Sequence, residues 1–372
     1  MKKFLARLFT RLADRFTSKP NEKAIHDSLT ALYKAILKNP KGEASLLETR
    51  IGQVVPFDMN TGRFIILSDQ HKGAGDASDD FFTNQKNYAA ALEYYYRENF
   101  TYVNLGDCEE LWENKPEPVL ELYNYLLQLE AKFLADKRYY KIFGNHDLLW
   151  FDITAVKKYL EPIFGKDLKI LEGLILQTNI GGNPVSFFLT HGHQGDKVSD
   201  NNAFSKWFVG RIWVPIQRWL QLNVNTPAKD FHLTDKHNRL MYLWTLRYKD
   251  VVLVTGHTHK PVFESLDHIQ RLNNQLKDAQ NLGNADEAGL LKNEIEKRIL
   301  EYGGNPDQIS SWVKPTYYNS GCCCFNDGDI TGIEIADGKI RLVKWTSKTG
   351  QPERKVAEES PLEKILSDTP AS

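Results

Sequence analysis

Five short apolar segments place the strongest constraint on how this chain folds. Each is rich in β-branched or aromatic residues, a composition that strands favour. The segments are Arg63–Ser68, Phe100–Leu105, Tyr139–Phe143, Val185–Thr190 and Val251–Thr255. Stretches with helical patterning, Asn84–Asn99 and Pro118–Asp136, separate the first three. Alternation of this kind predicts an α/β fold in which helices cover the faces of a sheet.

Metal-ligand residue types follow directly after every one of these segments. In chain order the motifs are Asp69-Gln70-His71, Gly106-Asp107, Gly144-Asn145-His146-Asp147, His191-Gly192-His193 and Gly256-His257-Thr258-His259. In open α/β sheets, ligands bind in the crevice beyond the carboxyl ends of the strands. We therefore expect five strand ends to bring carboxylates, imidazoles and an amide to one rim.

Each motif alone has an ordinary structural explanation, because Gly-Asp is common in turns and a single histidine on a loop is usually a surface or core residue. All five together, each after an apolar strand, favour a shared metal site. Two divalent ions about 3.5–4 Å apart can share a hydroxide and clamp both oxygens of an in-line displacement at phosphorus. Mixed nitrogen and oxygen ligands suit manganese, iron or zinc better than magnesium or calcium. We expect two divalent ions, with manganese favoured.

These motifs resemble those of the calcineurin-like metallophosphoesterase family over about residues 63–260, and Tyr318–Gly321 resembles the strand that follows the last motif in many members. The resemblance implies an α/β (α+β) fold, a β-sandwich flanked by helices. It also implies a phosphoric ester or anhydride hydrolase in which Asp107 bridges two metal ions. The implied ligands are Asp69, His71 and His259 for one ion and Asn145, His191 and His257 for the other.

The same resemblance implies roles for two further residues of the third motif. His146 stabilises the developing charge or protonates the leaving oxygen, and Asp147 orients His146 through a hydrogen bond. A non-catalytic scaffold of the same fold is the alternative. Loss of ligand residues would mark such a scaffold, and every expected ligand position is occupied by a competent residue.

Composition limits the partners and the compartment. The formal net charge of the 372 residues is −1, so no nucleic-acid partner is expected. No apolar run approaches the ~20 residues of a membrane span. Three of the four cysteines, Cys322–Cys324, are adjacent and cannot pair among themselves in normal disulfide geometry, so a cytoplasmic location is the simpler interpretation. We expect these cysteines to form a buried strand; a third metal site or a redox site is the alternative.

Changes in pattern predict the domain boundaries. Residues 1–20 form a basic amphipathic helix, 21–60 a helical extension, 61–345 the catalytic domain and 346–372 a polar C-terminal tail. The domain carries an aromatic helical insertion at about 196–249 and a charged helical pair at about 266–303. Asp337-Gly338, between two alternating apolar runs, predicts a β-hairpin.

The residues that follow the second motif narrow the range of possible substrates. Cys108–Trp112 lacks the arginine that grips phosphate in protein phosphatases of this superfamily. Together, the segments Leu67–Gly73 and Cys108–Trp112 look more like those of the UDP-2,3-diacylglucosamine hydrolase branch, whose members cleave a lipid-linked nucleotide. That resemblance implies a lid whose Trp207 and Trp213 line an acyl-chain chamber. For His193 the resemblance to the wider family leaves two roles open, contact with the substrate phosphate or support of the ligands from behind. Gln70 and His193 themselves depart from the residues usual in that branch.

Two alternatives to this substrate interpretation stay open. The aromatic stretch is equally consistent with a pair of core helices, since aromatic residues at helical spacing usually pack inward. The substrate is then a soluble nucleotide or another small phosphoester, cleaved by a phosphodiesterase or phosphatase activity.

The N-terminal helix predicts a membrane contact. Six apolar residues share one face, and six basic residues flank it against a single acid, Asp14. This pattern fits residues 1–19 lying on an anionic membrane surface, which would make the protein peripheral on the cytoplasmic face. A helix docked on the domain surface fits the same pattern equally well.

Overall fold

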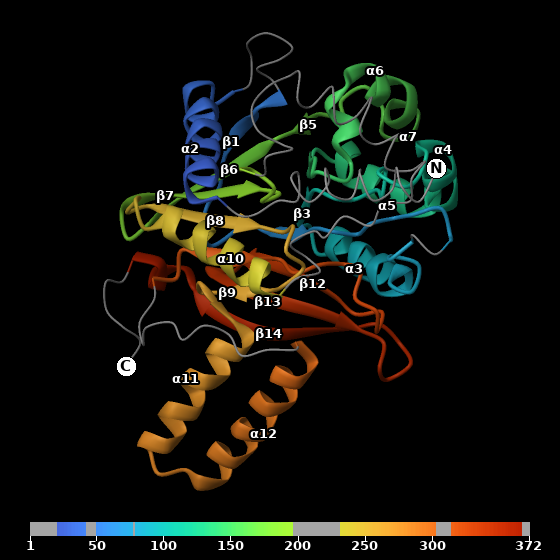
Figure 1. Cartoon of the computed structure of the whole chain (residues 1–372). Helices are drawn as coiled ribbons and strands as arrows, with labels where there is room; N and C mark the ends of the chain where they lie inside the picture. Colours follow the sequence, from blue (N-terminus) through green and yellow to red (C-terminus); the bar gives the residue numbers. More distant parts are fainter. Residues whose placement is uncertain (1–20, 42–49, 77–78, 196–230, 303–313, 367–372) are drawn as a thin grey trace, which may run out of the picture.

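The computed structural model describes residues 21–41, 50–76, 79–195, 231–302 and 314–366. Two mixed β-sheets, each of seven strands, pack face to face, and helices cover their outer faces (Figure 1). The predicted fold class, a β-sandwich flanked by helices, is confirmed. The N-terminal helix and the aromatic stretch with Trp207 and Trp213 lie outside the described residues.

The first sheet carries three of the five predicted strands. Its order is β14-β13-β12-β2-β3-β4-β5. The neighbours β2 (Phe64–Leu67), β3 (Thr101–Leu105), β4 (Tyr139–Ile142) and β5 (Ile170–Leu171) are parallel. The antiparallel strands β12 (Ile330–Ala336), β13 (Lys339–Thr346) and β14 (Glu353–Pro361) extend the sheet from β2. The parallel strands end together, and this places the first three motifs side by side.

The second sheet carries the other two predicted strands. Its order is β1-β6-β7-β8-β11-β9-β10. Parallel pairing joins β7 (Asn183–Thr190), β8 (Val251–Thr255) and β11 (Tyr317–Asn319). The remaining strands are β1 (Gly52–Pro56), β6 (Gly173–Ile180), β9 (Val262–Phe263) and β10 (Leu266–Asp267). Every residue of β8 is buried, which explains why its sequence is a continuous apolar run instead of an alternating one.

Apolar side chains of the two sheets interlock in the middle of the sandwich. Ile66, Val103 and Ile142 of the first sheet belong to one buried cluster with Phe187 and Val252 of the second. Burial of an aliphatic or aromatic side chain of this size contributes about 1.5–3 kcal/mol relative to exposure. This packing holds the two sets of strand ends opposite each other.

Helices α2 (Glu22–Lys38) and α10 (Phe231–Thr245) cover the outer face of the second sheet. Asn21 caps α2 by accepting a hydrogen bond from the amide of Ala24 at 3.0 Å. Met241 and Trp244 of α10 are buried in the same apolar cluster as Leu29 of α2. The last part of the predicted aromatic insertion is therefore a helix of the core.

The outer face of the first sheet is covered by α3 (Gln85–Arg97) and α5 (Asn124–Ala135). The single helix predicted over Pro118–Asp136 is two helices, because one residue separates the end of α4 (Pro116–Leu122) from the start of α5. The break falls at Tyr123, whose ring is buried and whose hydroxyl donates to Asp79 at 2.6 Å. Short helices α6 (Ile153–Ala155) and α7 (Glu161–Phe164) follow the third motif.

The C-terminal region differs from the predicted polar tail. The hairpin at Asp337-Gly338 is present, and residues 353–361 then form β14, which pairs with β13 along its length. Most residues of β14 are exposed or half-buried, as expected for an edge strand carrying charged residues. An edge strand of this kind lacks the apolar alternation by which sequence patterns reveal strands.

The three adjacent cysteines are buried, as predicted, but they do not form a strand. Cys322–Cys324 lie in the loop between β11 and β12, directly after Gly321, which has φ +74°. The amide of Cys323 donates to the carbonyls of Ser68 and Asp69 instead of joining a strand ladder. The loop is therefore attached to the end of β2, beside the first motif.

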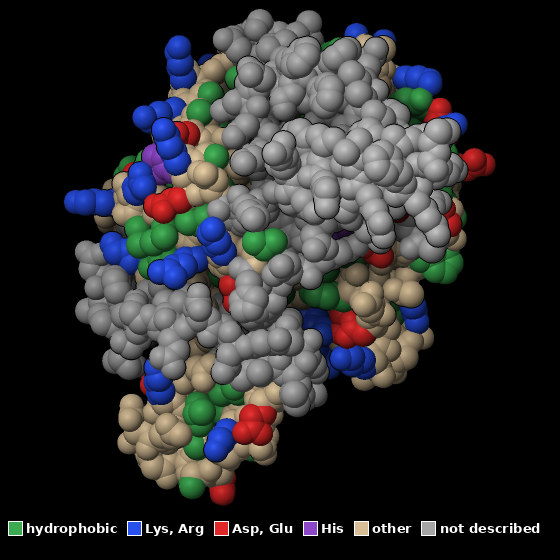
Figure 2. Space-filling model, in the orientation of Figure 1, with side chains coloured by type: hydrophobic (Ala, Val, Ile, Leu, Met, Phe, Trp, Pro, Cys, Tyr) green, Lys and Arg blue, Asp and Glu red, His purple; other side chains and the backbone are tan. Residues whose placement is uncertain are grey.

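The charged helical pair predicted at 266–303 projects from the sandwich as an antiparallel hairpin of α11 (His268–Asn281) and α12 (Ala285–Tyr302) (Figure 1). Leu272 and Ile295 are buried between the two helices. Figure 2 shows isolated hydrophobic side chains among polar ones on this hairpin, and Leu282 at its tip is 84 % exposed. Across the described residues, no helix is both long and apolar enough to cross a bilayer.

Candidate metal centre

The parallel strands of both sheets deliver their motifs to one rim. Asp69, Asp107 and Asn145 follow β2, β3 and β4 of the first sheet, whereas His191 and His257 follow β7 and β8 of the second. Five residues of the motifs have left-handed backbones, with φ between 50° and 67°: Asp69, His71, Asp107, His257 and His259. Such conformations cost free energy outside glycine and cluster at functional sites.

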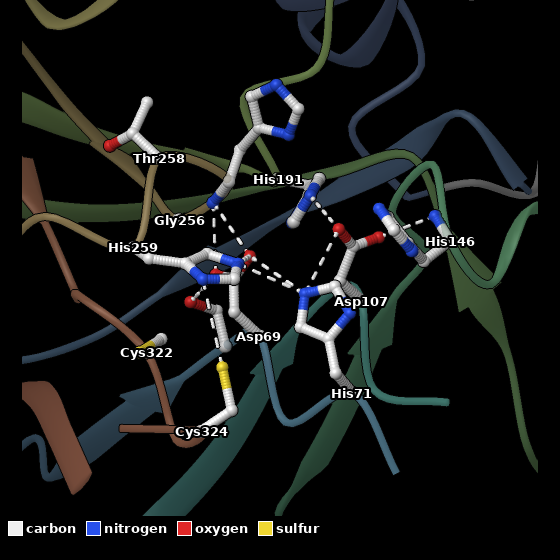
Figure 3. A network of polar contacts seen from close by, with 12 residues as sticks. Asp69, His71, Asp107, His146, His191, Gly256, Thr258, His259, Cys322 and Cys324 are labelled. Carbon is white, nitrogen blue, oxygen red and sulfur yellow. Dashed lines mark hydrogen bonds and ion pairs between the residues drawn. The ribbon is translucent and has the colours of Figure 1, made fainter. Parts of the chain in front are cut away.

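The first group of ligand atoms comes from Asp69, His71 and His259 (Figure 3). The Nε2 atom of His259 lies 3.2 Å from Oδ1 of Asp69 and 3.1 Å from Nε2 of His71. Asp69 is fully buried, and its carboxylate accepts hydrogen bonds from the amide of His257 and the hydroxyl of Ser68. The structure thus brings together the three residues expected to hold one ion.

The second group comes from Asp107, His191 and His257, whose ligand atoms lie within 4.8 Å of one another. Oδ2 of Asp107 is 3.0 Å from Nε2 of His191 and 3.8 Å from Nε2 of His71. One carboxylate oxygen therefore faces both groups. This is the position that a bridging ligand needs.

Outward hydrogen bonds fix the orientation of two of the histidines. Nδ1 of His191 is 2.9 Å from the carbonyl oxygen of Leu105, to which it donates. Nδ1 of His71 is 2.9 Å from Oε2 of Glu110. Because Nδ1 of each ring is engaged outward, Nε2 faces the carboxylates of Asp107 and Asp69, where a bound cation would take the place of a proton.

The surroundings of Asn145 and of two glycines show that the motif residues fit a pair of metal ions. Oδ1 of Asn145 is buried and has no hydrogen-bond partner among the described residues, which suits an atom intended for a metal. A Cβ at Gly144 would collide with the carboxylate of Asp107, and one at Gly256 would collide with that of Asp69. The motif glycines therefore leave room for the carboxylates, and the donor set fits two transition-metal ions.

The buried carboxylates and imidazoles perturb one another strongly. Burial opposes the charged form of Asp107, yet the neighbouring His191 and His146 outweigh it and hold the pKa of Asp107 well below its usual range. Burial likewise opposes protonation of His191, but Asp107 and Asp69 raise its pKa to about 10. The same balance, with Asp69 as the nearest charge, raises the pKa of His259 to about 9. This concentration of negative charge also attracts cations, which would replace the protons.

His146 lies beside this centre on its accessible side. Its side chain is 15 % exposed, its amide donates to Oδ1 of Asp107 at 2.7 Å, and its Nδ1 lies 2.6 Å from Oε2 of Glu110. Burial lowers the pKa of His146, but Glu110 and Asp107 overcome this and raise it to about 9. The ring of Trp112 stacks on the imidazole at 3.9 Å, so both the charge and the plane of His146 are set by neighbours.

Asp147 does not hold His146 as predicted. Its carboxylate accepts hydrogen bonds from the amides of Gly144 at 2.6 Å and Cys108 at 2.9 Å. The carboxylate turns back into the loop, where burial raises its pKa to about 6. Asp147 therefore fixes the loop that carries the third motif, and Glu110 takes the orienting position that the resemblance implied for Asp147.

A buried network of charges lies behind the motifs. Nζ of Lys72 is 2.9 Å from Oε1 of Glu130, and Nζ of Lys141 is 3.1 Å from Oε2 of Glu109. All four side chains are completely buried. Because Lys72 follows His71 and Glu109 precedes Glu110, these paired charges hold the loops that carry the ligands.

Sequence reasoning gave no role to Glu110, Trp112 or His237. His237 of α10 is buried, donates through Nε2 to the carbonyl of Gly192 at 2.8 Å, and has its ring 5.3 Å from that of His257. No spacing signal marks His237, because it lies far along the chain from the motif it contacts. His193 is also buried, with its ring 5.5 Å from that of His191, so its contact with substrate stays a prediction.

Comparison with known proteins agrees with the fold. Residues 62–261, more than half of the chain, match the calcineurin-like phosphoesterase family, and the chain belongs to this family. A search of curated proteins finds no significant match.

Solved structures with a similar arrangement are distant in sequence. Vacuolar protein sorting 29 from Cryptosporidium parvum has 12 % identity and a TM-score of 0.34, covering 81 % of this chain and 98 % of its own. The same protein from Entamoeba histolytica has 13 % identity and a TM-score of 0.29, covering 79 % and 98 %. A dimetal phosphatase from Danio rerio has 9 % identity and a TM-score of 0.38, covering 80 % and 100 %.

Proposed function

We propose that this protein is a dinuclear metal-dependent phosphohydrolase that cleaves a phosphate ester or pyrophosphate bond. The observation that carries this proposal is the meeting of two three-residue ligand groups at the single carboxylate of Asp107. When bound, a pair of divalent ions supplies an activated water and positive charge for the phosphoryl oxygens. Asp69, His71 and His259 would hold one ion, and Asn145, His191 and His257 the other.

His146 supplies the proton that the leaving group takes up. Burial lowers the pKa of His146, but the charge of Glu110 raises it and so favours the protonated form that can act as an acid. Glu110 holds Nδ1, so Nε2 is the nitrogen left to donate a proton to the oxygen of the leaving group. Stacking on Trp112 prevents the ring from rotating away.

For the substrate, we favour a lipid-linked nucleotide such as UDP-2,3-diacylglucosamine. The support is the continuation of the Gly-Asp motif through Glu110 and Trp112, both of which contact His146. A soluble nucleotide or small phosphoester is the second candidate, because α10, the part of the insertion that the structure describes, packs in the core. We favour manganese as the metal and association with the cytoplasmic face of a membrane, where a lipid substrate resides.

The experiment is a hydrolysis screen of the manganese-loaded protein against bis(p-nitrophenyl) phosphate, nucleotides and UDP-linked lipids. Asp107→Asn is the test variant, since a neutral amide cannot offset the repulsion between two cations. Asp136→Asn is the control, because Asp136 is exposed and contacts Arg138 and Tyr96 instead of residues of the centre. Hydrolysis by the wild type and by the control, but not by Asp107→Asn, supports the proposal.

Two results would refute the proposal. Normal turnover by Asp107→Asn would exclude a mechanism based on a shared carboxylate. A wild type that binds no divalent metal and hydrolyses none of these substrates would favour the non-catalytic scaffold. Preference for UDP-linked lipids over soluble nucleotides would distinguish the two substrate candidates.

A further inference from the structure

His259 presents its two ring nitrogens to different surroundings (Figure 3). Nε2 faces Oδ1 of Asp69 at 3.2 Å, inside the proposed dinuclear centre. Nδ1 faces Sγ of Cys324 at 3.7 Å, on the other side of the ring. Metal-bound histidines usually direct their second nitrogen at a carboxylate, a carbonyl or water. A thiol in this position requires a separate explanation.

A second thiol lies at the same place. Cys322 and Cys324 are buried, carry free thiols, and are separated by one residue in the loop between β11 and β12. One ligand atom from each of Cys322, Cys324 and His259 lies within 4.8 Å of the other two. The intervening Cys323 is directed elsewhere, with its sulfur 3.9 Å from the carbonyl oxygen of Thr331.

One distance within this group fits a tetrahedral metal site, and the other two are below 4.8 Å. With bonds of about 2.3 Å to sulfur and about 2.0 Å to nitrogen, ligand atoms around zinc are separated by about 3.5–3.8 Å. The 3.7 Å between Cys324 Sγ and His259 Nδ1 lies in this range. The loop is also held in place, because the amide of Cys323 is bonded to the carbonyls of Ser68 and Asp69.

We propose that Cys322, Cys324 and His259 Nδ1 form a third metal site, which takes a thiophilic divalent ion of the zinc class. Two thiolates and an imidazole nitrogen form a softer ligand set than the carboxylate, amide and imidazole groups of the dinuclear centre, so the third site has the stronger preference for a thiophilic ion. Binding releases the two thiol protons and the proton on Nδ1. The imidazole of His259 then joins the third site to the dinuclear centre, and zinc bound there changes the affinity of Asp69 and His71 for their own ion.

Cobalt(II) is the probe for this site, because it occupies zinc sites and absorbs in the near ultraviolet when bound by thiolate. Full-length protein, freed of metal and kept reduced, is titrated with cobalt. We expect thiolate-to-cobalt absorption in the wild type and its loss in Cys322→Ser/Cys324→Ser, with one fewer cobalt ion bound per chain. Cys323→Ser is the matched control and keeps the absorption, since its sulfur lies outside the cluster.

Failure of this proposal is distinguishable from failure of the proposed function. Asp107→Asn disturbs the dinuclear centre but leaves all three ligands of the third site, so it keeps the thiolate absorption. Absence of that absorption in the reduced wild type overturns the proposal, as does absorption that survives loss of both thiols. If the double variant does not fold, the single variant Cys324→Ser replaces it, and absorption as strong as that of the wild type overturns the proposal.

Discussion

Replacing Glu110 with Gln removes the negative charge that holds two histidines of the centre. Oε2 of Glu110 lies 2.6 Å from Nδ1 of His146 and 2.9 Å from Nδ1 of His71. The attraction is mutual: although burial opposes its charged form, the two histidines hold the pKa of Glu110 at about 2. Gln keeps the size and a hydrogen-bonding oxygen, so the variant removes the charge with little change in shape.

The shift in the pKa of His146 determines how far Glu110→Gln moves the pH profile of activity. Burial lowers this pKa, Glu110 is the strongest influence raising it, and the balance lies at about 9 against an ordinary value of 6.5. Without the charge we expect the pKa to fall by about one to two units, each unit being worth about 1.4 kcal/mol.

The assay is a pH profile of kcat for an alkyl phosphoester, with Glu121→Gln, an exposed acid of α4, as the control. A general acid is active while protonated, so activity falls as the pH rises through the pKa of His146. In Glu110→Gln this fall begins about one to two pH units lower. An alkaline limb at the same pH in both variants would refute the coupling of Glu110 to His146.

Three further predictions follow from the site and the sequence. His146→Ala lowers turnover by about two to four orders of magnitude at near-normal metal content, and less for p-nitrophenyl than for alkyl esters; equal losses would remove His146 from the acid role. Metal affinity, measured by equilibrium dialysis, falls as the pH falls, because protons compete with the metal at His191 and His259. Burial opposes protonation of both residues, but buried carboxylates outweigh it and raise their pKa values to about 10 and about 9. A metal affinity that does not depend on pH would contradict this. Full-length protein sediments with anionic liposomes more than a chain beginning at Asn21 does, and salt weakens the difference, each basic residue contributing about 1 kcal/mol; equal sedimentation would leave residues 1–19 as a structural appendage.

The ligand residues were predictable because each follows its strand immediately. His191 comes directly after β7 and Asp69 two residues after β2, so finding the strands was enough to locate the ligands. The apolar runs are long enough to reveal the strands, since the central ones are buried on both faces. The sequence also predicted that the five strand ends meet at one rim, but not that the strands are divided between two sheets.

The orienting residues were not predictable in the same way. Glu109 and Glu110 are adjacent and chemically alike, yet Glu109 pairs with Lys141 in the buried network and Glu110 faces His146. Only the direction of each side chain along the loop distinguishes them. Asp147 was misassigned for the same reason, because its carboxylate turns toward backbone amides that are invisible in a sequence pattern.

The edge of the first sheet escaped prediction for a different reason. β14 is bounded by Glu353 and Pro361 and is largely exposed, so neither apolar alternation nor a continuous apolar run marks it. Its pairing depends on backbone contacts with β13, which the sequence does not display. Patterns of burial predict central strands well and edge strands poorly.

The most direct test of the dinuclear centre is electron paramagnetic resonance of the protein loaded with manganese(II). Two manganese ions joined by the carboxylate of Asp107 are magnetically coupled, and their spectrum differs from that of isolated ions. We predict a coupled signal at two equivalents of manganese in the wild type and only isolated-ion signals in Asp107→Asn. A wild type that shows only isolated manganese at two equivalents would contradict the shared site.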